Sequence, residues 1–521
     1  MNNKKKSSNV TTMGVIMLLT LLGKITGLVR DMLLGHNFAT GMLSNAFLAA
    51  SRIPRNFFDA IFASAISASF IPVFNEYLEK QGKEEAYRLS NAFITIMALL
   101  TAALSGLGML FAPQLTAFLA DGFDQPTAAL CSALLRILFP TVIFTGLAFS
   151  MVGILQSLGR FNVPAVISAV SNLVIIAYYI FFCDRFGIYG LAAAFLIGWA
   201  MQVIVQFPSL RKEGYHYRLS LRHEGLKKIF ALMLPVMVST WIQPINLAVS
   251  TKYASRLFQG AGSSALEYAN TLYTIIAGVF VLSIVNVIFP EMSRQAAGQQ
   301  QEAMGRTVGA TLQGMLYFLT PMTVGLMLLA KPVIRLLYEW GNWDAFSTEI
   351  TSRALLFLSI GMIGYGIQCV LSRAFYAQQN GRVPLLAGAV SILVNILLCR
   401  LLSSSMDVAG LALASSVSSV VSALLLFLPI KKRWPELLPK DFWQDLGKIL
   451  AASLLMAGAV YGGEQVLASA VGDGVISRIV LVLLPALIGA ALYILLTWIM
   501  KVSTLRKGVD LLRKRMHKED I

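Results

Sequence analysis

Long apolar segments, separated by short polar loops, recur from one end of the chain to the other. A helix needs about 20 mainly apolar residues to cross the hydrocarbon core of a bilayer, and the pattern predicts fourteen such segments. They cover residues 10–34, 41–72, 87–112, 128–157, 163–183, 186–208, 226–256, 263–290, 306–330, 349–378, 383–401, 406–430, 446–470 and 476–500. The pattern therefore predicts an all-α, polytopic membrane protein.

The loops between these segments alternate in charge. The N-terminus, every second loop and the C-terminal tail carry most of the 42 Lys and Arg residues, whereas the other loops carry few. Because cytoplasmic loops are enriched in Lys and Arg, both termini are expected in the cytoplasm. The first segment continues to about Arg30 without a small-residue cleavage site, so we interpret it as a retained span rather than a signal peptide.

Composition agrees with this interpretation. Hydrophobic residues make up 57% of the chain and charged residues 13%, and the mean hydropathy is +0.70, which excludes a set of soluble domains. The net charge of +16 is scattered over short loops and forms no basic domain. Attraction to anionic lipid headgroups explains this charge better than nucleic-acid binding does.

No pattern of reactive residues indicates catalysis. The four cysteines and four histidines lie far apart in the sequence, and no nucleophile elbow, phosphate-binding loop or zinc-protease motif is present. They are Cys131, Cys183, Cys369, Cys399, His36, His216, His223 and His517. The acids of the predicted outer loops, such as Asp121 and Glu339, form no recognisable motif either. We therefore expect a transporter without a cofactor rather than an enzyme.

The sequence also repeats itself at a spacing of about 220 residues. The run GRFNVP at 159–164 matches GRVP at 381–384, and GLAAA at 190–194 matches GLALA at 410–414. Further matches join Pro72 to Pro290, Pro113 to Pro332, and Pro208 to Pro429. Repetition at a nearly constant offset indicates duplication.

The duplication predicts two six-helix lobes and an extra helix pair. The expected lobes are 1–215 and 216–435, followed by 436–521, which holds the last two helices and a basic cytoplasmic tail. Because each lobe has an even number of spans, the two lobes share one orientation, as in parallel repeats of alternating-access transporters. Two bundles packed only for stability are the alternative.

When basic residues near the span ends are counted with the loops, seven basic residues remain inside the predicted spans. They are Lys24, Arg30, Arg52, Arg55, Arg136, Lys252 and Arg353. A cation facing lipid at a helix centre costs roughly 2.5–3.5 kcal/mol, so such residues should face water or the bundle interior.

These seven residues fall into two groups by their depth within the spans. Arg136 and Arg353 lie near helix ends and are expected to extend toward the interface, and Lys252 fits either location. Lys24, Arg30, Arg52 and Arg55 are expected to line a hydrated cavity. Only two acids, Asp31 and Asp59, lie near them. This excess of cations predicts an anionic substrate, and arginine's planar fork suits phosphate.

Several of these stretches resemble the MurJ (MviN) family of flippases. The resemblance is carried by the following segments and extends over the whole chain: GLVRD at 27–31, AF at 46–47, RIP at 52–54, FIPVFNEY at 70–77, VIFP at 287–290, RAFYA at 373–377 and RVP at 382–384. It implies a fourteen-helix transporter of the superfamily that includes MATE drug exporters. It also implies flipping of lipid II, the undecaprenyl-pyrophosphate-linked peptidoglycan precursor, from the inner to the outer leaflet.

The resemblance further implies roles for single residues. Arg30 takes the place of a cavity arginine, and Lys24 stands where another arginine is common. With Arg52 and Arg55 these residues are the predicted pyrophosphate site. Asp31, Asn45, Asp59 and Lys252 are further candidates for the cavity or its gate; at Asn45 the family commonly has aspartate.

Other positions depart from the family pattern. Phe58 and Thr271 replace arginines found in some members. Ser250 and Cys399 stand where sodium-binding members have carboxylates, although Asn395 is retained. We therefore expect no metal site of the family's sodium type.

The resemblance also implies a cellular location and binding partners, and it leaves alternative functions to consider. The protein should lie in the bacterial cytoplasmic membrane, bind lipid II and membrane lipids but no nucleic acid, and work beside cell-wall synthesis proteins. One alternative is a flippase for another polyprenyl-pyrophosphate-linked glycan. A MATE-like drug antiporter would need acidic cavity residues, and a membrane-embedded glycan enzyme would need an acid–base pair on an outer loop.

Overall fold

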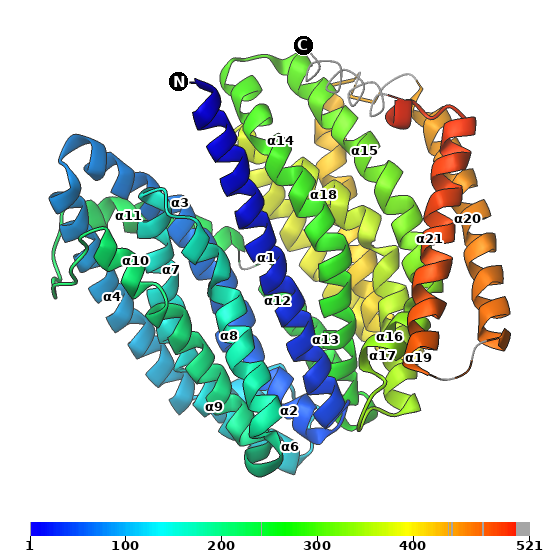
Figure 1. Cartoon of the computed structure of the whole chain (residues 1–521), viewed down its shortest axis with the longest axis horizontal. Coiled ribbons are helices and arrows are strands. Elements are labelled where there is room, and N and C mark those ends of the chain that lie inside the picture. The colour runs from blue at the N-terminus through cyan, green and yellow to red at the C-terminus, as the bar shows by residue number, and fades with distance from the viewer. Residues whose placement is uncertain are drawn as a thin grey trace. The chain divides into compact units, whose positions relative to one another are not determined.

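The computed structural model describes residues 2–240, 242–435, 437–438, 441–470, 472 and 474–506. Helices joined by short loops make up this part of the chain (Figure 1). Contacts divide the chain into two compact units, Met1–Ser264 and Ala265–Ile521. The all-α prediction is confirmed, whereas most of the predicted basic tail, from residue 507 onward, lies outside the described residues.

The first unit contains α1 to α12, a π-helical turn, a short 3₁₀ helix (η2, Phe258–Gly260) and the start of α13. The helices and the turn are α1 (Asn2–Phe38), α2 (Met42–Ser51), η1 (Arg52–Phe57, the π-helical turn), α3 (Phe58–Lys80), α4 (Lys83–Leu110), α5 (Ala112–Leu119), α6 (Gln125–Leu138), α7 (Thr141–Ser157), α8 (Asn162–Phe181), α9 (Cys183–Ile204), α10 (Phe207–Lys212), α11 (Gly225–Thr240) and α12 (Ile242–Ala254). Pro54 lies within η1 and has no N–H to donate, which explains why regular α-helical hydrogen bonding is interrupted there.

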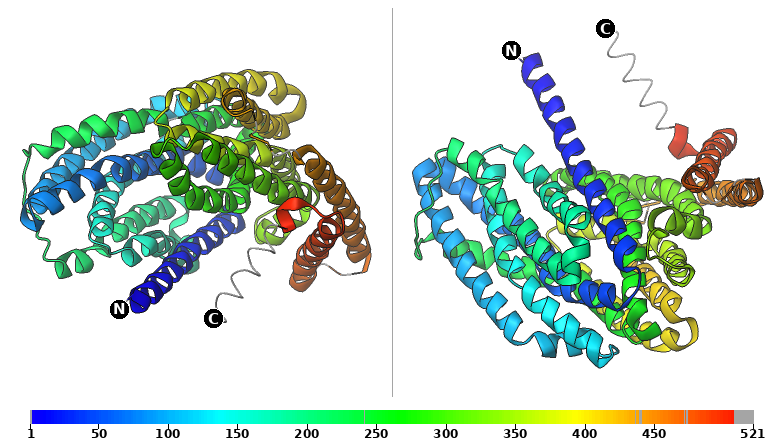
Figure 2. Two further views of the ribbon diagram at one scale, coloured as in Figure 1. Left: turned by 90° about the horizontal axis from the view of Figure 1, so that it is seen from above. Right: turned by 60° about the horizontal axis from the view of Figure 1, so that its bottom comes forward.

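The second unit begins within α13 and ends with the helix pair α20 and α21. Its elements are α13 (Ala261–Tyr273), η3 (Thr274–Gly278, π-helical), α14 (Val279–Ala297), α15 (Gln301–Leu328), α16 (Ala330–Tyr338), α17 (Ala345–Ile360), α18 (Met362–Ala377), α19 (Arg382–Arg433), α20 (Phe442–Ala470) and α21 (Val475–Ile499). Figure 2 shows α20 and α21 side by side, and they pack along each other.

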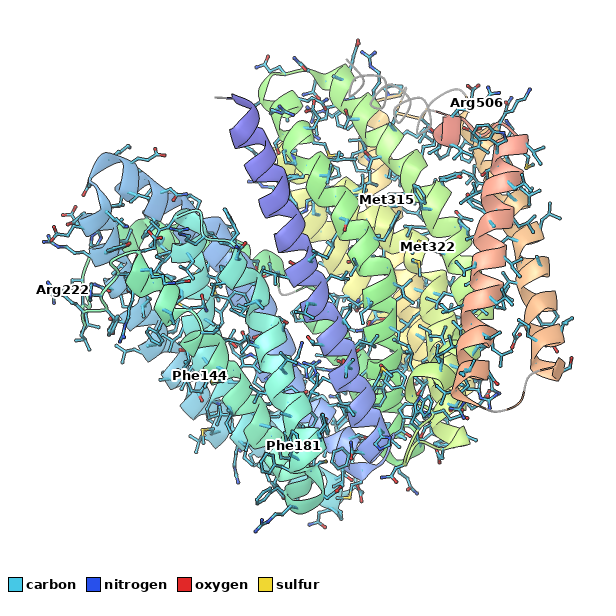
Figure 3. All side chains as sticks on the ribbon, in the orientation of Figure 1. Phe144, Phe181, Arg222, Met315, Met322 and Arg506 are labelled. Carbon is cyan, nitrogen blue, oxygen red and sulfur yellow. The ribbon has the colours of Figure 1, made fainter. Side chains whose placement is uncertain are left out.

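Apolar side chains cover the outside of the helices, as expected for segments that face lipid. Phe181 on α8 is 73% exposed and projects outward (Figure 3). Buried positions instead carry many small or hydroxylated residues, such as Ser171 and Ser418. Small side chains let membrane helices approach closely, whereas burial of large apolar groups gives little advantage when the solvent is itself apolar.

Ten helices of the described residues are long and apolar enough to cross a membrane, or eleven if α17 and α18, bent by 45°, form one span. α1 is 37 residues long but carries several charges, and α11 and α12 end and begin next to residue 241, which lies outside the described residues. α19 runs for 52 residues, with non-helical dihedral angles at Asp407, and covers the two spans predicted at 383–401 and 406–430. The count of fourteen stays a prediction.

The duplication is visible in the secondary structure. α4 and α15 are both 28 residues long. Each is preceded by a proline-containing helix, α3 or α14, and each of those helices follows a π-helical turn, η1 or η3. The short helices α5 and α16 follow α4 and α15 in the same way. The two halves therefore repeat element by element.

Residues with positive φ repeat at the same spacing. Four pairs lie about 220 residues apart: Ala39 and Gln259, Gly82 and Gln299, Gly159 and Gln379, and Gly187 and Asp407. Such backbone conformations are uncommon for residues other than glycine. Their recurrence at matched loops indicates that the duplication preserved loop geometry even where the glycines were lost.

The compact units do not follow the predicted lobe boundary. α11 contacts α3 and α4, and α12 contacts α5 and η1, so the segment after residue 215 packs within the first unit. The predicted domains 1–215, 216–435 and 436–521 describe a duplication in sequence rather than contacts, and they stay a prediction.

Ion pairs join loops that are predicted to lie on the same side of the membrane. Glu213 accepts from Arg160 at 2.7 Å and pairs with Lys83 at 3.4 Å, which joins three loops predicted to face the cytoplasm. Asp121 accepts from Arg256 at 2.9 and 2.6 Å, which joins two loops predicted to face outside. These contacts agree with the predicted alternation of the loops between the two sides of the membrane. They do not test which of the two sides is cytoplasmic.

Candidate functional site

Arg30 is held near the end of α1 by polar contacts on two sides. Its Nε and one terminal nitrogen donate to Asp31 Oδ1 at 2.9 and 2.8 Å, and the other terminal nitrogen donates to Asn172 Oδ1 at 2.9 Å. Asn172 lies on α8, which packs along α1. The guanidinium is therefore fixed in orientation and only 8% of the residue is exposed.

Asn172 also ties the helix backbone around Arg30. Its Nδ2 donates to the carbonyl oxygen of Gly23 at 3.1 Å and to Thr26 Oγ1 at 3.3 Å. A Cβ atom at Gly27 would lie 3.4 Å from this nitrogen, in van der Waals contact with the amide. Asn172 thus connects α8 to two turns of α1.

Arg55 comes from η1 and meets Arg30 at an aromatic ring. The guanidinium carbons of Arg30 and Arg55 lie 5.5 and 5.4 Å from the centre of the Phe195 ring on α9. Cation–π attraction stabilises a guanidinium beside a ring, more strongly when water is excluded. The structure therefore brings two of the four predicted cations together within the first unit.

Asp59, one turn after Arg55, lies beside the same group. Its Oδ1 accepts from Thr145 Oγ1 at 2.8 Å and from Trp199 Nε1 at 3.4 Å. Both arginines lie close enough to attract its charge. With Asp31 and Asp59 included, the charges of this cluster balance, so it is less cationic than the sequence suggested.

Arg52 points to a different helix. One of its terminal nitrogens donates to the carbonyl oxygen of Leu247 at 2.9 Å and also to Thr251 Oγ1, both on α12. The residue is 5% exposed. Arg52 and Arg55 are neighbours in sequence, yet they contact opposite parts of the unit, α12 and α9. Lys24 is exposed on α1 and is not part of the Arg30–Arg55 cluster.

Lys252 and Asn45 have contacts that the sequence did not indicate. Lys252 Nζ lies 3.4 Å from Asp121 Oδ2 and 5.3 Å from the centre of the Phe118 ring. Arg256, which hydrogen-bonds Asp121, lowers the pKa of that carboxyl below its usual value, with Lys252 adding to the effect. Asn45 is buried and its Oδ1 accepts from Ser264 Oγ at 2.6 Å.

The two positions of the family's sodium site are both buried. Ser250 Oγ donates to the carbonyl oxygen of Asn246 at 3.3 Å, one turn back on α12. Cys399 Sγ lies 3.6 Å from Asn395 Oδ1 on α19. Within the described residues, no group of three His, Cys, Asp or Glu side chains could hold a metal ion.

Four residues that contact Arg30, Arg55 or Asp59 could not be recognised in the sequence. Asn172, Phe195, Thr145 and Trp199 are uncharged and lie in apolar segments, so they gave no signal that separates them from residues packed for stability. Their role became visible only once α8 and α9 were placed beside α1 and η1. As a group, the cluster offers two oriented guanidiniums whose present partners are carboxylates and an amide, and such donors also suit phosphate oxygens.

Comparisons of the sequence with known proteins agree on one family. A family model described as lipid II flippase MurJ matches residues 34–481. The lipid II flippase MurJ of Burkholderia cenocepacia is 28% identical over 457 residues, which cover 85% of this chain and 87% of the relative. A probable lipid II flippase MurJ of Haemophilus influenzae is 29% identical over 469 residues, with 85% and 90% covered.

Solved structures agree. A lipid II flippase MurJ in an inward closed conformation superposes with a TM-score of 0.78 at 25% identity, covering 93% of this chain and 98% of that one. An inward-facing multidrug resistance MATE family transporter of the MOP superfamily superposes with a TM-score of 0.67 at 14% identity, covering 81% and 98%. The second likeness is one of fold alone.

Proposed function

Because the chain belongs to the MurJ family of lipid II flippases, we propose that it moves lipid II from the inner to the outer leaflet and that Arg30 and Arg55 recognise the pyrophosphate. The family and the many apolar helices make it a multi-pass protein of the bacterial inner membrane. Its work is transport, and no step of the proposal requires catalysis.

The strongest support for this pyrophosphate site is the arrangement of its two arginines. Two arginines from different elements, α1 and η1, lie within 5.5 Å of one ring in the interior of the first unit. Buried charges are costly and are kept in membrane proteins mainly where they serve a substrate or ion pathway. Arginines that only anchored helices would instead extend toward the interface, as the exposed Arg353 can.

Substrate binding would proceed by exchange of partners. In the free protein, Asp31 and Asn172 occupy the hydrogen-bonding edges of Arg30. A pyrophosphate brings more negative charge and more acceptor oxygens than a single carboxylate, so it competes with Asp31 for the same fork. Asn172 and Phe195 would keep the guanidinium in place during the exchange.

Transport would use the duplicated architecture. Two repeated lobes that share one orientation suit alternating access, in which the binding site opens first to one side and then to the other. With both termini in the cytoplasm, an inside-negative potential favours outward movement of the pyrophosphate by about 2.3 kcal/mol per charge per 100 mV. At later steps of transport, Arg52, Lys24 and Lys252 would contact the pyrophosphate. Cell-wall synthesis proteins would then receive the flipped lipid II.

Depletion of the protein in its host tests the function directly. Lipid II should accumulate in the inner leaflet, and a copy of the gene should restore its export. A copy with Arg30→Ala should fail to restore export although it inserts normally, because removal of a buried charge does not hinder insertion. A matched Arg353→Gln copy should restore export. Accumulation of a different lipid-linked glycan would contradict the substrate assignment.

A further inference from the structure

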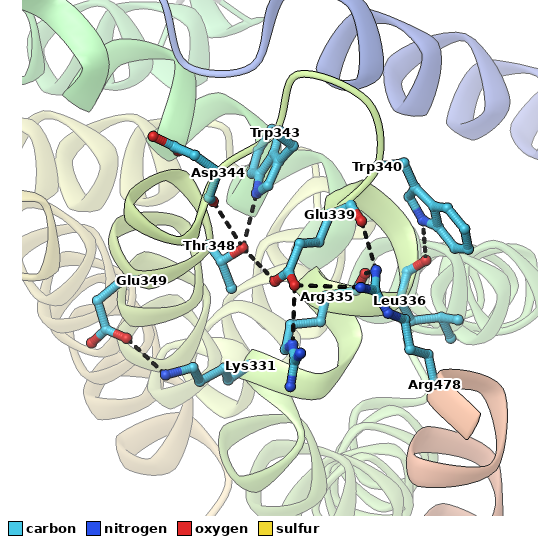
Figure 4. Close-up of polar contacts among 10 residues, drawn as sticks. All are labelled: Lys331, Arg335, Leu336, Glu339, Trp340, Trp343, Asp344, Thr348, Glu349 and Arg478. Carbon is cyan, nitrogen blue, oxygen red and sulfur yellow. Dashed lines mark hydrogen bonds and ion pairs between the residues drawn. The ribbon is translucent and has the colours of Figure 1, made fainter. Parts of the chain in front are cut away.

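A cavity of about 130 Å³ lies in the second unit, between α16 and the helix pair α20 and α21. Its walls are Lys331, Pro332, Arg335, Glu464, Ala468, Gly472, Arg478 and Leu481. Three of these residues are cations and one is an acid. The cavity lies at helix ends beside loops that the charge pattern predicts on the outer side of the membrane. Figure 4 shows its three cations with the acids that they contact.

Acids outside the cavity wall hold the three cations in place. Arg478 donates to the carbonyl oxygen of Glu339 at 2.6 Å and to that of Arg335 at 3.3 Å. Glu339 Oε1 lies 3.3 Å from Arg335 Nε and 3.5 Å from Arg478 NH2 (Figure 4). Lys331 Nζ lies 3.1 Å from Glu349 Oε2. Because Glu339 and Glu349 are not part of the wall, the three cations lie between these carboxylates and the cavity, and an anion in the cavity would share their donors with the carboxylates.

The surroundings of the cavity suit a lipid. Near it on α20 and α21, Val466 and Ile476 are 66% and 78% exposed, so apolar side chains face the bilayer beside the charged wall. The Arg478 guanidinium lies 5.2 Å from the centre of the Trp340 ring. Tryptophan is enriched where membrane meets water, so this pair fits the depth of lipid headgroups.

We propose that this cavity binds the phosphate group of an anionic phospholipid headgroup. One ammonium and two guanidiniums match the charge and the acceptor oxygens of a phosphate. One water molecule needs about 10–15 Å³ of such space, so a cavity of about 130 Å³ has room for a phosphate group. The acyl chains would lie along the exposed apolar residues of α20 and α21.

Lipid binding can be measured by native mass spectrometry of the purified protein in neutral detergent. We expect the wild type to retain added phosphatidylglycerol over phosphatidylcholine, which is zwitterionic. Lys331→Gln should weaken retention of phosphatidylglycerol about fivefold, the effect of losing one partly exposed charge pair. Glu464→Gln should strengthen retention, because it removes the acid from the wall. Both side chains lie near the surface, so the fold should tolerate either change.

Arg185→Gln is the matched control, since Arg185 is an exposed cation on a loop that is also predicted to face outside. It should retain phosphatidylglycerol as the wild type does. Competition by inorganic phosphate would support recognition through the phosphate group. Displacement by undecaprenyl pyrophosphate at far lower concentration than by phosphatidylglycerol would overturn the assignment to a phospholipid. Equal retention by the wild type and Lys331→Gln, or weaker retention by Glu464→Gln, would overturn the anion site itself.

Discussion

Arg30 shows how a single charged residue can be recognised in the sequence while its surroundings cannot. Its depth in a predicted span marked it as a cavity residue, and in the structure it is buried beside the Phe195 ring, which the half-buried Arg55 also contacts. The same reasoning predicted that Arg52 and Arg55 line one cavity, and residues three apart on a regular helix would share a face. The π-helical turn at Pro54 changes that geometry, and the two side chains contact different helices.

Asn172 is predicted to position Arg30 for the substrate. Asn172→Ala should lower the flipping rate about tenfold or less, because Arg30 keeps its bonds to Asp31 but loses one charge-assisted hydrogen bond, roughly 1.5 kcal/mol. Asn172→Asp should be more harmful, since a second carboxylate would compete with the pyrophosphate. Flipping rates in liposomes, with Ser171→Ala as a neighbouring control on α8, measure both effects. A rate for Asn172→Asp above that of Asn172→Ala would contradict the exchange of partners.

Arg52 is predicted to need its guanidinium rather than only its charge. One terminal nitrogen donates to two acceptors on α12, the carbonyl oxygen of Leu247 and the Thr251 hydroxyl. Lysine keeps the charge but not the planar fork, so Arg52→Lys should restore export only in part when the wild-type protein is depleted. Membrane protein levels, followed in the same cells, separate lost function from lost expression. Full restoration by Arg52→Lys would show that charge alone suffices.

At the scale of elements, the helical segments were predictable and their joints were not. Long apolar runs gave the helices because each run reflects the thickness of the bilayer. The π-helical turns and the kink of α19 at Asp407 depend on single backbone positions and tertiary contacts. The packing of α11 on α3 also escaped prediction, because apolar faces that contact lipid or protein look alike in sequence.

The loops at Gly187 and Asp407 give a prediction at this scale. Both residues have φ of 53°, with ψ of −144° and −133°, a conformation that suits glycine. Asp407→Gly should therefore raise thermal stability, whereas Gly187→Ala should lower it by about 1–3 kcal/mol. A Cβ at Gly187 would meet nothing within 4 Å, so only backbone strain should act. The fraction of protein that stays monodisperse after heating in detergent measures both changes, and stabilisation by Gly187→Ala would contradict the matched loop geometry.

At the scale of the whole molecule, the charge pattern predicts an orientation that labelling can test. Single cysteines would be placed in a background without Cys131, Cys183, Cys369 and Cys399. A cysteine at Asp124 should react with a membrane-impermeant maleimide added outside intact cells, and one at Lys227 should react only after permeabilisation. The positions Asp473 and Lys440 would extend the test to the last helices and lie outside the described residues. Outside labelling at Lys227 would reverse the orientation.

The energy source is also a property of the whole molecule. Ser250 and Cys399 carry no carboxylate, so transport should depend on membrane potential and should not change when sodium is replaced at constant potential. Flipping in liposomes with an imposed potassium diffusion potential, with and without sodium, measures the two effects separately. A requirement for sodium at constant potential would point to a cation site built from other residues.

The central claim is that Arg30 and Arg55 together recognise the pyrophosphate of lipid II. Its most direct test is the rate at which purified protein, reconstituted into liposomes, brings lipid II to the opposite leaflet. The double variant Arg30→Ala/Arg55→Ala should be slower than the wild type by about tenfold or more, given roughly 1.5–3 kcal/mol for each charge-assisted hydrogen bond lost. Arg353→Gln, an exposed arginine within a predicted span, should flip at the wild-type rate. A double variant that flips lipid II as fast as the wild type would contradict the claim.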